Sequence, residues 1–180
     1  MKIKAVIFDL DGTLLDSMHI WKSNDWNYIA DAYKHEVELK PGVFDFLETL
    51  RQNNLRMILA TATDRHLMEP ALHRTGIYPF FEKIFTCGEV GSSKHSPLIY
   101  NKALDFLKLK QSEVMVFEDA HYAALTAHTA GFRVAVIYDK WENKHFGEGE
   151  IERLAEIYIE DYRLINSPSN PSNMTPFRFS

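Results

Sequence analysis

The sequence predicts a three-layer α/β fold, in which a parallel β-sheet lies between two layers of helices. The first observation is a regular alternation along the 180 residues, where five short apolar runs are separated by segments with helical spacing. The second is that these runs are apolar at successive positions, as expected for strands buried on both faces. The third is a hydrophobic content of 46%, which is sufficient for a core on each side of the sheet. Strands joined through helices are expected to be parallel, with right-handed crossovers.

The first apolar run, at residues 5–8, leads into two aspartates, Asp9 and Asp11, and then Gly12. Residues two apart in an extended chain point to the same side, so both carboxylates can project from the end of this strand. Gly12 allows a sharp turn directly after them. Two carboxylates this close raise each other's pKa, and a bound hard cation is a common compensation. An ordinary Asx-type turn would give the same pattern, so this motif does not decide alone.

The remaining elements follow from the usual start and stop signals. We predict helices over residues 16–35, 43–53, 64–75, 97–108 and 120–130, and strands over residues 55–60, 83–87, 113–117 and 133–137. Residues 88–96 are expected to form a loop that contains Lys94. After the fifth strand we predict a polar loop at 141–149, a last helix at 151–157, a short extended piece at 158–159 and a Ser/Pro/Asn-rich tail at 166–180.

Composition limits the classes of function. The formal charge of −5 with scattered basic residues argues against a nucleic acid partner. The longest apolar runs fall short of the 18 residues or so that a membrane span needs, which argues against a membrane protein. The first residues lead directly into a strand without a signal-peptide pattern. The single cysteine, Cys87, cannot form an internal disulfide, and we therefore expect a cytoplasmic protein.

Polar residues follow the predicted strand ends in four places. These residues are Asp9 and Asp11, Thr61 and Thr63, Lys94, and the pair Glu118 and Asp119. In open α/β sheets, ligands bind at the carboxyl ends of the strands, so these side chains can converge although they are far apart in sequence. Each cluster has an ordinary structural explanation when it is taken alone: a strand-end threonine, a solvated lysine, or acidic residues at a helix start. Those explanations do not account for the four clusters together.

The ordered set resembles the four motifs of the haloacid dehalogenase-like (HAD) hydrolases, most of which are phosphatases. The matching stretches are DLDGTL at 9–14, LAT at 59–61, the lysine Lys94, and VFED at 116–119. The resemblance covers roughly residues 3–14 and 41–165, and it is nearest to the phosphoglycolate phosphatase and β-phosphoglucomutase-like subgroup. It implies a Rossmann-like HAD-type core and a Mg²⁺-dependent phosphatase that hydrolyses a phosphate monoester of a small metabolite.

The resemblance also implies a role for each residue. Asp9 would be the nucleophile that forms an aspartyl-phosphate, and Asp11 would be the general acid and base. Mg²⁺ would be held by the Asp9 carboxylate, the Asp11 backbone carbonyl and Asp119, with Glu118 nearby or acting through water. Lys94 would offset the negative charge, and Thr61 with the backbone N–H of Ala62 would hold the phosphoryl oxygens. His121 and His128 are expected to be surface or packing residues, although His121 lies close enough in sequence to touch the site.

The chain departs from its relatives where a helical cap is usually inserted. Only residues 15–40 occupy that place, and we interpret them as a truncated cap stub between core segments 1–14 and 41–165. The site should therefore be open. The aromatic residues Trp21, Trp26 and Tyr33 of the stub either pack on the core or form a surface that pairs with a second chain in a homo-oligomer. A second departure is that two residues separate Lys94 from Pro97, whereas relatives often have the proline directly after the lysine.

Three alternatives to a phosphatase remain at this stage. A core that lost its cap could be a catalytically weak interaction module that still binds phosphate and Mg²⁺; the complete set of site residues argues against it. A response-regulator receiver also uses Asp, Thr, Lys and Mg²⁺, but the strand-end aspartate expected mid-chain is missing. A mutase that retains the phosphoryl group normally needs a closing cap.

Overall fold

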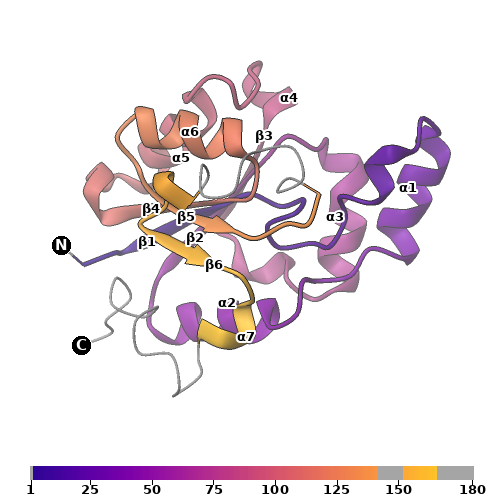
Figure 1. Cartoon of the computed structure of the whole chain (residues 1–180), viewed down its shortest axis with the longest axis horizontal. Helices are drawn as coiled ribbons and strands as arrows, with labels where there is room; N and C mark the ends of the chain where they lie inside the picture. The colour runs from indigo at the N-terminus through magenta and orange to yellow at the C-terminus, as the bar shows by residue number, and fades with distance from the viewer. Residues whose placement is uncertain (1, 142–151, 166–180) are drawn as a thin grey trace.

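The structure, a computed structural model, describes residues 2–141 and 152–165, and it contains one six-stranded sheet between helices (Figure 1). The strands are β1 (Ala5–Phe8), β2 (Arg56–Thr61), β3 (Lys83–Thr86), β4 (Val114–Glu118), β5 (Arg133–Ile137) and β6 (Ile157–Ile159). The α-helices are α1 (Trp26–His35), α2 (Val43–Gln52), α3 (Arg65–Arg74), α4 (Cys87–Val90), α5 (Leu98–Leu107), α6 (His121–Thr129) and α7 (Tyr162–Ile165). Short 3-10 turns are η1 (Ile20–Lys22), η2 (Tyr78–Phe80), η3 (Gln111–Glu113) and η4 (Glu152–Leu154).

All strand pairs are parallel, and the strand order is β3-β2-β1-β4-β5-β6. β1 is central, with Phe8 in register with Leu59 of β2 and with Phe117 of β4. The continuous burial of β1, 0% exposed at every residue, is the physical reason for its unbroken apolar sequence. The predicted three-layer α/β fold with a parallel sheet is thus confirmed.

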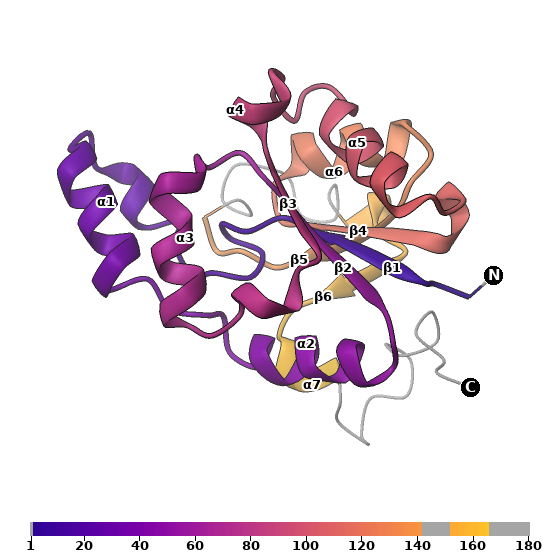
Figure 2. The same ribbon diagram turned by 180° about the vertical axis from the view of Figure 1, so that it is seen from behind.

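Each face of the sheet carries its own hydrophobic core. On one face Phe8 contacts Phe117, with ring centroids 4.8 Å apart, and Phe46 of α2 packs against both rings. The helices α2, α3 and α7 contribute to this core. On the other face the core joins Ile7 and Val116 to residues of α5 and α6. Figures 1 and 2 show α5 and α6 on one side of the sheet and α2 with α7 on the other.

The predicted helix over residues 16–35 is wrong as a single element. The chain instead forms the turn η1 and then the shorter helix α1. Asp25 explains the break, because its side chain caps α1 by accepting hydrogen bonds from the N–H groups of Asn27 at 2.9 Å and Tyr28 at 3.4 Å. A residue with that role lies outside the helix that it caps.

The stub that contains α1 is attached to the core at both ends. Its two ends form a short antiparallel bridge between Leu15 and Leu39, and the N–H of Lys40 donates to the carbonyl of Leu14 at 2.8 Å. α1 packs on α3, which lies between α1 and the sheet in both views (Figures 1 and 2). Tyr33 is fully buried and Trp21 is partly buried against the core, whereas the Trp26 side chain is 65% exposed. Packing on the core therefore accounts for two of the three stub aromatics.

Two further predictions need correction. Residues 88–96 are not entirely loop, because Thr86 caps a short helix, α4, by accepting from the N–H of Glu89 at 3.2 Å. The predicted helix at 151–157 is wrong over its described part. There the structure has η4 followed by β6, which pairs with β5 and buries Ile157 and Ile159. The predicted loop at 141–149, from residue 142 on, and the tail at 166–180 lie outside the described residues.

The other predicted strands and helices are present with bounds that shift by about one or two residues. No helix in residues 2–141 and 152–165 has both the length and the apolar character needed to cross a membrane.

Candidate active site

The residues of the four motifs meet at the carboxyl ends of three adjacent strands. Asp9 directly follows β1, Thr61 is the last residue of β2, and Glu118 is the last residue of β4. β1 lies between β2 and β4, at the point where connections leave in opposite directions along the sheet. Ligands bind at this kind of switch point in open α/β sheets. Lys94 reaches the same edge from the loop between α4 and α5.

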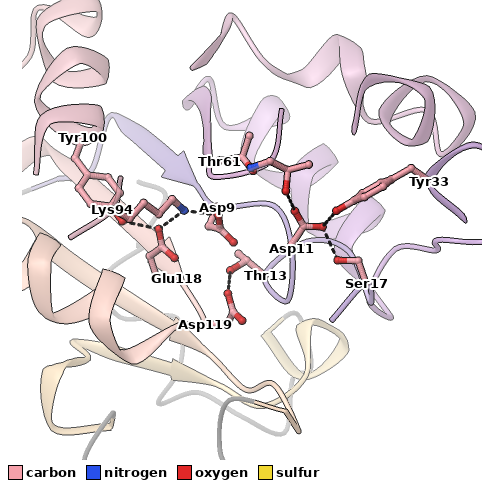
Figure 3. Close-up of polar contacts among 11 residues, drawn as sticks. Asp9, Asp11, Thr13, Ser17, Tyr33, Thr61, Lys94, Tyr100, Glu118 and Asp119 are labelled. Atoms are coloured by element: carbon pink, nitrogen blue, oxygen red, sulfur yellow. Dashed lines mark hydrogen bonds and ion pairs between the residues drawn. The ribbon is translucent and has the colours of Figure 1, made fainter. Parts of the chain in front are cut away.

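Lys94 joins two of the carboxylates. Its ammonium is ion-paired with Asp9 and, at 2.6 Å, with Oε1 of Glu118, and the residue is only 3% exposed (Figure 3). Burial would lower the pKa of Lys94, but the charges of Asp9 and Glu118 outweigh burial and hold its pKa above the ordinary value. The hydroxyl of Tyr100 donates to the same Glu118 oxygen at 2.7 Å. The lysine is therefore a buried cation fixed between two strand ends.

Asp119 completes a buried acidic cluster. One carboxylate oxygen each of Asp9, Glu118 and Asp119 lie within 4.8 Å of one another. Thr13 donates to Oδ1 of Asp119 at 2.9 Å. Burial first, and then the charges of Asp9 and Glu118, raise the pKa of Asp119 well above the ordinary value. A cation at this position would relieve that repulsion.

Two oxygens of this cluster have no hydrogen-bond partner in the part of the chain that the structure describes. They are Oε2 of Glu118 and Oδ2 of Asp119, and both are buried. Buried carboxylate oxygens are normally paired, and an isolated one is costly. A hard divalent cation takes oxygen ligands of this kind. The cluster therefore fits the Mg²⁺ that the sequence motifs imply.

Asp11 lies beside the cluster in an environment of hydroxyl groups. Ser17 and Tyr33 each donate to Oδ1 at 2.5 Å, and Thr63 donates to Oδ2 at 2.6 Å. Figure 3 shows Asp11 turned toward Ser17 and Tyr33 and away from Asp119. Burial and the charge of Asp9 raise the pKa of Asp11, while the three hydroxyls act in the opposite direction.

A cavity of about 280 Å³ opens over these groups. Its lining includes the charged residues Asp9, Asp11, Lys94, Glu118 and Asp119, together with Thr61, Ala62 and Thr63. Thr61 is buried, and its Oγ1 accepts from the N–H of Thr63 at 3.0 Å. The remaining lining is largely apolar and consists of Met18, Trp21, Ala120 and Tyr122. The structure thus brings every site residue named from the sequence to one cavity.

Sequence reasoning missed the hydroxyl groups that contact the carboxylates, which are Thr13, Ser17, Tyr33, Thr63 as an Asp11 partner, and Tyr100. Thr13 lies within the first motif. The other four hydroxyls have no signal in the neighbouring sequence, because the carboxylate that each one contacts is 6 to 52 residues away along the chain. On α6 the cavity is lined by Tyr122, whereas His121 is not part of the lining.

Comparison with known proteins agrees with this geometry. The haloacid dehalogenase-like hydrolase family matches residues 23–131. Protein CbbY of Rhodobacter capsulatus is 25% identical over 194 aligned positions, covering 76% of this chain and 86% of CbbY. A phosphorylated carbohydrates phosphatase of Thermotoga maritima is 24% identical over 151 positions, covering 84% of this chain and 69% of that protein.

A solved structure shares the fold. CbbY from Rhodobacter sphaeroides in complex with phosphate superposes with a TM-score of 0.71 at 19% sequence identity, covering 93% of this chain and 98% of CbbY. The family match spans more than half of the chain, and the four motifs lie together at one edge of the sheet. This chain belongs to the haloacid dehalogenase-like hydrolase family.

Proposed function

We propose that this protein is a Mg²⁺-dependent phosphatase that hydrolyses a phosphate monoester through an aspartyl-phosphate on Asp9. The observation that supports this most directly is the position of Asp9, which lines the cavity, is ion-paired with Lys94, and belongs to the acidic cluster with Glu118 and Asp119. A nucleophilic carboxylate, a fixed cation and a candidate metal site thus meet at one point.

Mg²⁺ would be held by the Asp9 carboxylate, the Asp11 backbone carbonyl and Asp119, with Glu118 beside them or acting through water. Oε2 of Glu118 and Oδ2 of Asp119, which have no hydrogen-bond partner among the described residues, favour this assignment. When bound, the ion would offset the negative charge of the carboxylates and the phosphoryl group.

The chain's own residues supply the two displacement steps. In the first, a carboxylate oxygen of Asp9 attacks phosphorus, the ester P–O bond breaks, and Asp11 gives its proton to the departing oxygen. In the second, Asp11 accepts a proton from water, whose oxygen attacks phosphorus and breaks the bond to Asp9. Inorganic phosphate leaves, and both aspartates return to their initial states.

Other residues hold the phosphoryl group during these steps. Lys94, Thr61 and Ala62 line the cavity. The ammonium of Lys94, the hydroxyl of Thr61 and the backbone N–H of Ala62 would hold the phosphoryl oxygens there. Lys94 also orients Asp9 through their ion pair. Such fixed donors and charges supply much of the stabilisation in phosphoryl transfer.

We propose a small phosphorylated metabolite with an uncharged leaving group as the substrate. Among the described residues lining the cavity, Lys94 is the one cation, and two carboxylates already engage it. The rest of the substrate would lie against Met18, Trp21 and Tyr122, which suits a leaving group with an apolar face. A relative that acts on phosphorylated carbohydrates is consistent with a small organic phosphate.

We further propose that residues 15–40 are what remains of the family's cap, between core segments 1–14 and 41–165, with 166–180 as a tail. A homo-oligomer would form through the exposed side chains of Trp26 and Tyr28. Analytical ultracentrifugation would test this second proposal, because Trp26→Ser should abolish any concentration-dependent association. The single Cys87 suits a reducing compartment, which supports the cytoplasm as the location.

The test of the proposed function is hydrolysis of p-nitrophenyl phosphate with and without Mg²⁺, using Asp9→Asn as the comparison. We expect metal-dependent turnover that Asp9→Asn abolishes. If the wild-type protein binds Mg²⁺ without turnover, the result would favour either the alternative of an interaction module that has lost its cap or a cap supplied by another chain. Turnover that survives Asp9→Asn would rule out the aspartyl-phosphate mechanism.

A further inference from the structure

The cap stub reaches the centre of the site through one buried side chain, Tyr33 of α1. Its hydroxyl donates to Oδ1 of Asp11 at 2.5 Å (Figure 3). We propose that Tyr33 is a positioning residue, which holds the Asp11 carboxyl in the orientation needed to protonate the leaving group. This inference rests on the proposed function, because Tyr33 has this task only if Asp11 handles the proton.

Tyr33 is held rigidly enough for such a role. The side chain is 0% exposed, and α1 buries Ile29 and Ala32 beside it where the helix packs on α3. Trp21 lies edge-on to the phenol ring, with centroids 6.2 Å apart. A ring enclosed in this way loses little entropy when it orients a partner, since packing has already fixed its rotamer.

The three hydroxyls around Asp11 are unevenly shared between its oxygens. Ser17 and Tyr33 both donate to Oδ1, whereas only Thr63 donates to Oδ2. Hydrogen bonds to a carboxylate oxygen stabilise its negative charge, so Oδ2 is the more basic oxygen and the one to carry a transferable proton. Loss of the Tyr33 hydroxyl would reduce this difference and let the carboxyl rotate.

The phenol can donate this hydrogen bond at neutral pH, because a tyrosine hydroxyl is ordinarily protonated there. Because α1 belongs to residues 15–40, the shortened cap contributes directly to the geometry of the acid.

Leaving-group dependence separates positioning from a purely structural role. A departing alkoxide needs a proton in the transition state, whereas p-nitrophenolate is stable enough to leave without one. A badly positioned acid should therefore slow an alkyl phosphate far more than p-nitrophenyl phosphate. Loss of packing or of folded protein would slow both substrates by the same factor.

The experiment measures kcat/KM of Tyr33→Phe for p-nitrophenyl phosphate and for an alkyl phosphate, with saturating Mg²⁺. General acid catalysis contributes about 10²–10⁴-fold, so we expect at least a tenfold loss with the alkyl ester and less than about threefold with the aryl ester. The matched control is Tyr138→Phe, which removes a hydroxyl from a side chain that is 41% exposed and does not line the cavity. Both rates of this control should equal wild type. Partial unfolding cannot mimic the result, because the ratio of the two rates is independent of the amount of active enzyme.

Equal losses on the two substrates, or no loss on either, would overturn the positioning role. Asp11→Asn makes that failure distinguishable from failure of the proposed function. If Asp11→Asn loses the alkyl ester selectively while Tyr33→Phe does not, only the inference about Tyr33 is wrong. If Asp11→Asn shows no leaving-group dependence, the acid role of Asp11 in the proposed function is itself wrong.

Discussion

The backbone of Gly12 lies directly against the carboxylate of Asp119. A Cβ atom on residue 12 would be 2.1 Å from Oδ2 of Asp119, and Gly12 has a φ of +81°. Only glycine combines this backbone conformation with such a close approach. The turn within the first motif and the acidic residue of the fourth therefore pack directly against each other.

Gly12→Ala should cost both stability and activity. The left-handed backbone contributes about 1–2 kcal/mol of destabilisation for a non-glycine residue, and the added methyl group also displaces Asp119. Urea unfolding and Mg²⁺-dependent phosphatase assays measure the two effects. Gly91→Ala is the control, because its φ is +73° but an added Cβ there meets no atom within 4 Å. We expect that control to lose stability and keep its activity; loss of activity in both variants would contradict the steric explanation.

Lys94→Met should destabilise the protein as well as inactivate it. The change leaves Asp9 and Glu118 buried at one strand edge without their shared cation. Removing one partner of a buried ion pair typically costs about 3–5 kcal/mol. Urea unfolding should show this loss, while Lys102→Met, an exposed lysine on α5, should match wild type. A stability equal to wild type for Lys94→Met would show that the carboxylates are neutral in the folded protein.

Asp119→Asn should separate metal binding from folding. Wild-type protein is expected to gain about 2.7 kcal/mol of stability when Mg²⁺ is present at a hundred times its Kd. Asp119→Asn should lose most of this gain, because it removes a negative charge from the proposed metal site. Thermal unfolding with and without Mg²⁺ measures the difference, and the exposed Asp105→Asn is the matched control. A metal-induced shift in Asp119→Asn equal to that of wild type would place the ion elsewhere.

In the metal-free protein, the stability that Asp119 contributes should fall as pH rises. This is the opposite of the pH dependence that a salt-bridged aspartate gives. The pKa of Asp119 is raised in the folded state, so the folded state binds the proton more tightly than the unfolded chain does. Stability from this group therefore falls as pH rises above about 4, the ordinary pKa of the unfolded aspartate. Without Mg²⁺, Asp119→Asn should accordingly become more stable relative to wild type as pH increases from 5 to about 7. A constant difference across that range would contradict the raised pKa.

Trp21→Ala should change substrate binding more than chemistry. Trp21 lines the cavity with Met18 and Tyr122, on the side where the leaving group would lie. Loss of this apolar surface should raise KM for p-nitrophenyl phosphate by about tenfold with little change in kcat, and affect methyl phosphate much less. Phe44→Ala is the control, since Phe44 of α2 is 45% exposed and does not line the cavity. The same change in KM for both esters would mean that Trp21 only supports the stub.

The sequence alone determined five of the six described strands, their parallel arrangement and the set of polar and charged residues at one edge of the sheet. These properties have local causes. An unbroken apolar run such as residues 5–8 indicates a strand buried on both faces, and helices between strands require them to be parallel. The carboxyl ends of parallel strands lie at one edge, so Asp9, Thr61 and Glu118 could be expected to meet without any knowledge of distances.

Some elements were wrong or missed because their causes compete or lie far away in the chain. The helical spacing before residue 35 concealed the break at Asp25. The Asp25 side chain caps the start of α1, and this capping is favoured over a helix that continues through Asp25. β6 (Ile157–Ile159) was predicted only in part, as the extended piece at 158–159, because it forms where the edge of β5 buries Ile157 and Ile159. A short strand of this kind has too little periodicity to be recognised alone.

Only the tertiary structure decided which neutral groups surround the charged ones. Tyr33 and Thr63 donate to Asp11 across 22 and 52 residues, and nothing near either residue in the sequence indicates such a contact. A hydroxyl group has the same local pattern whether it faces solvent or a carboxylate. The site's charges could therefore be identified from the chain, whereas their orientation and hydrogen bonding depend on how α1 and the strand ends pack together.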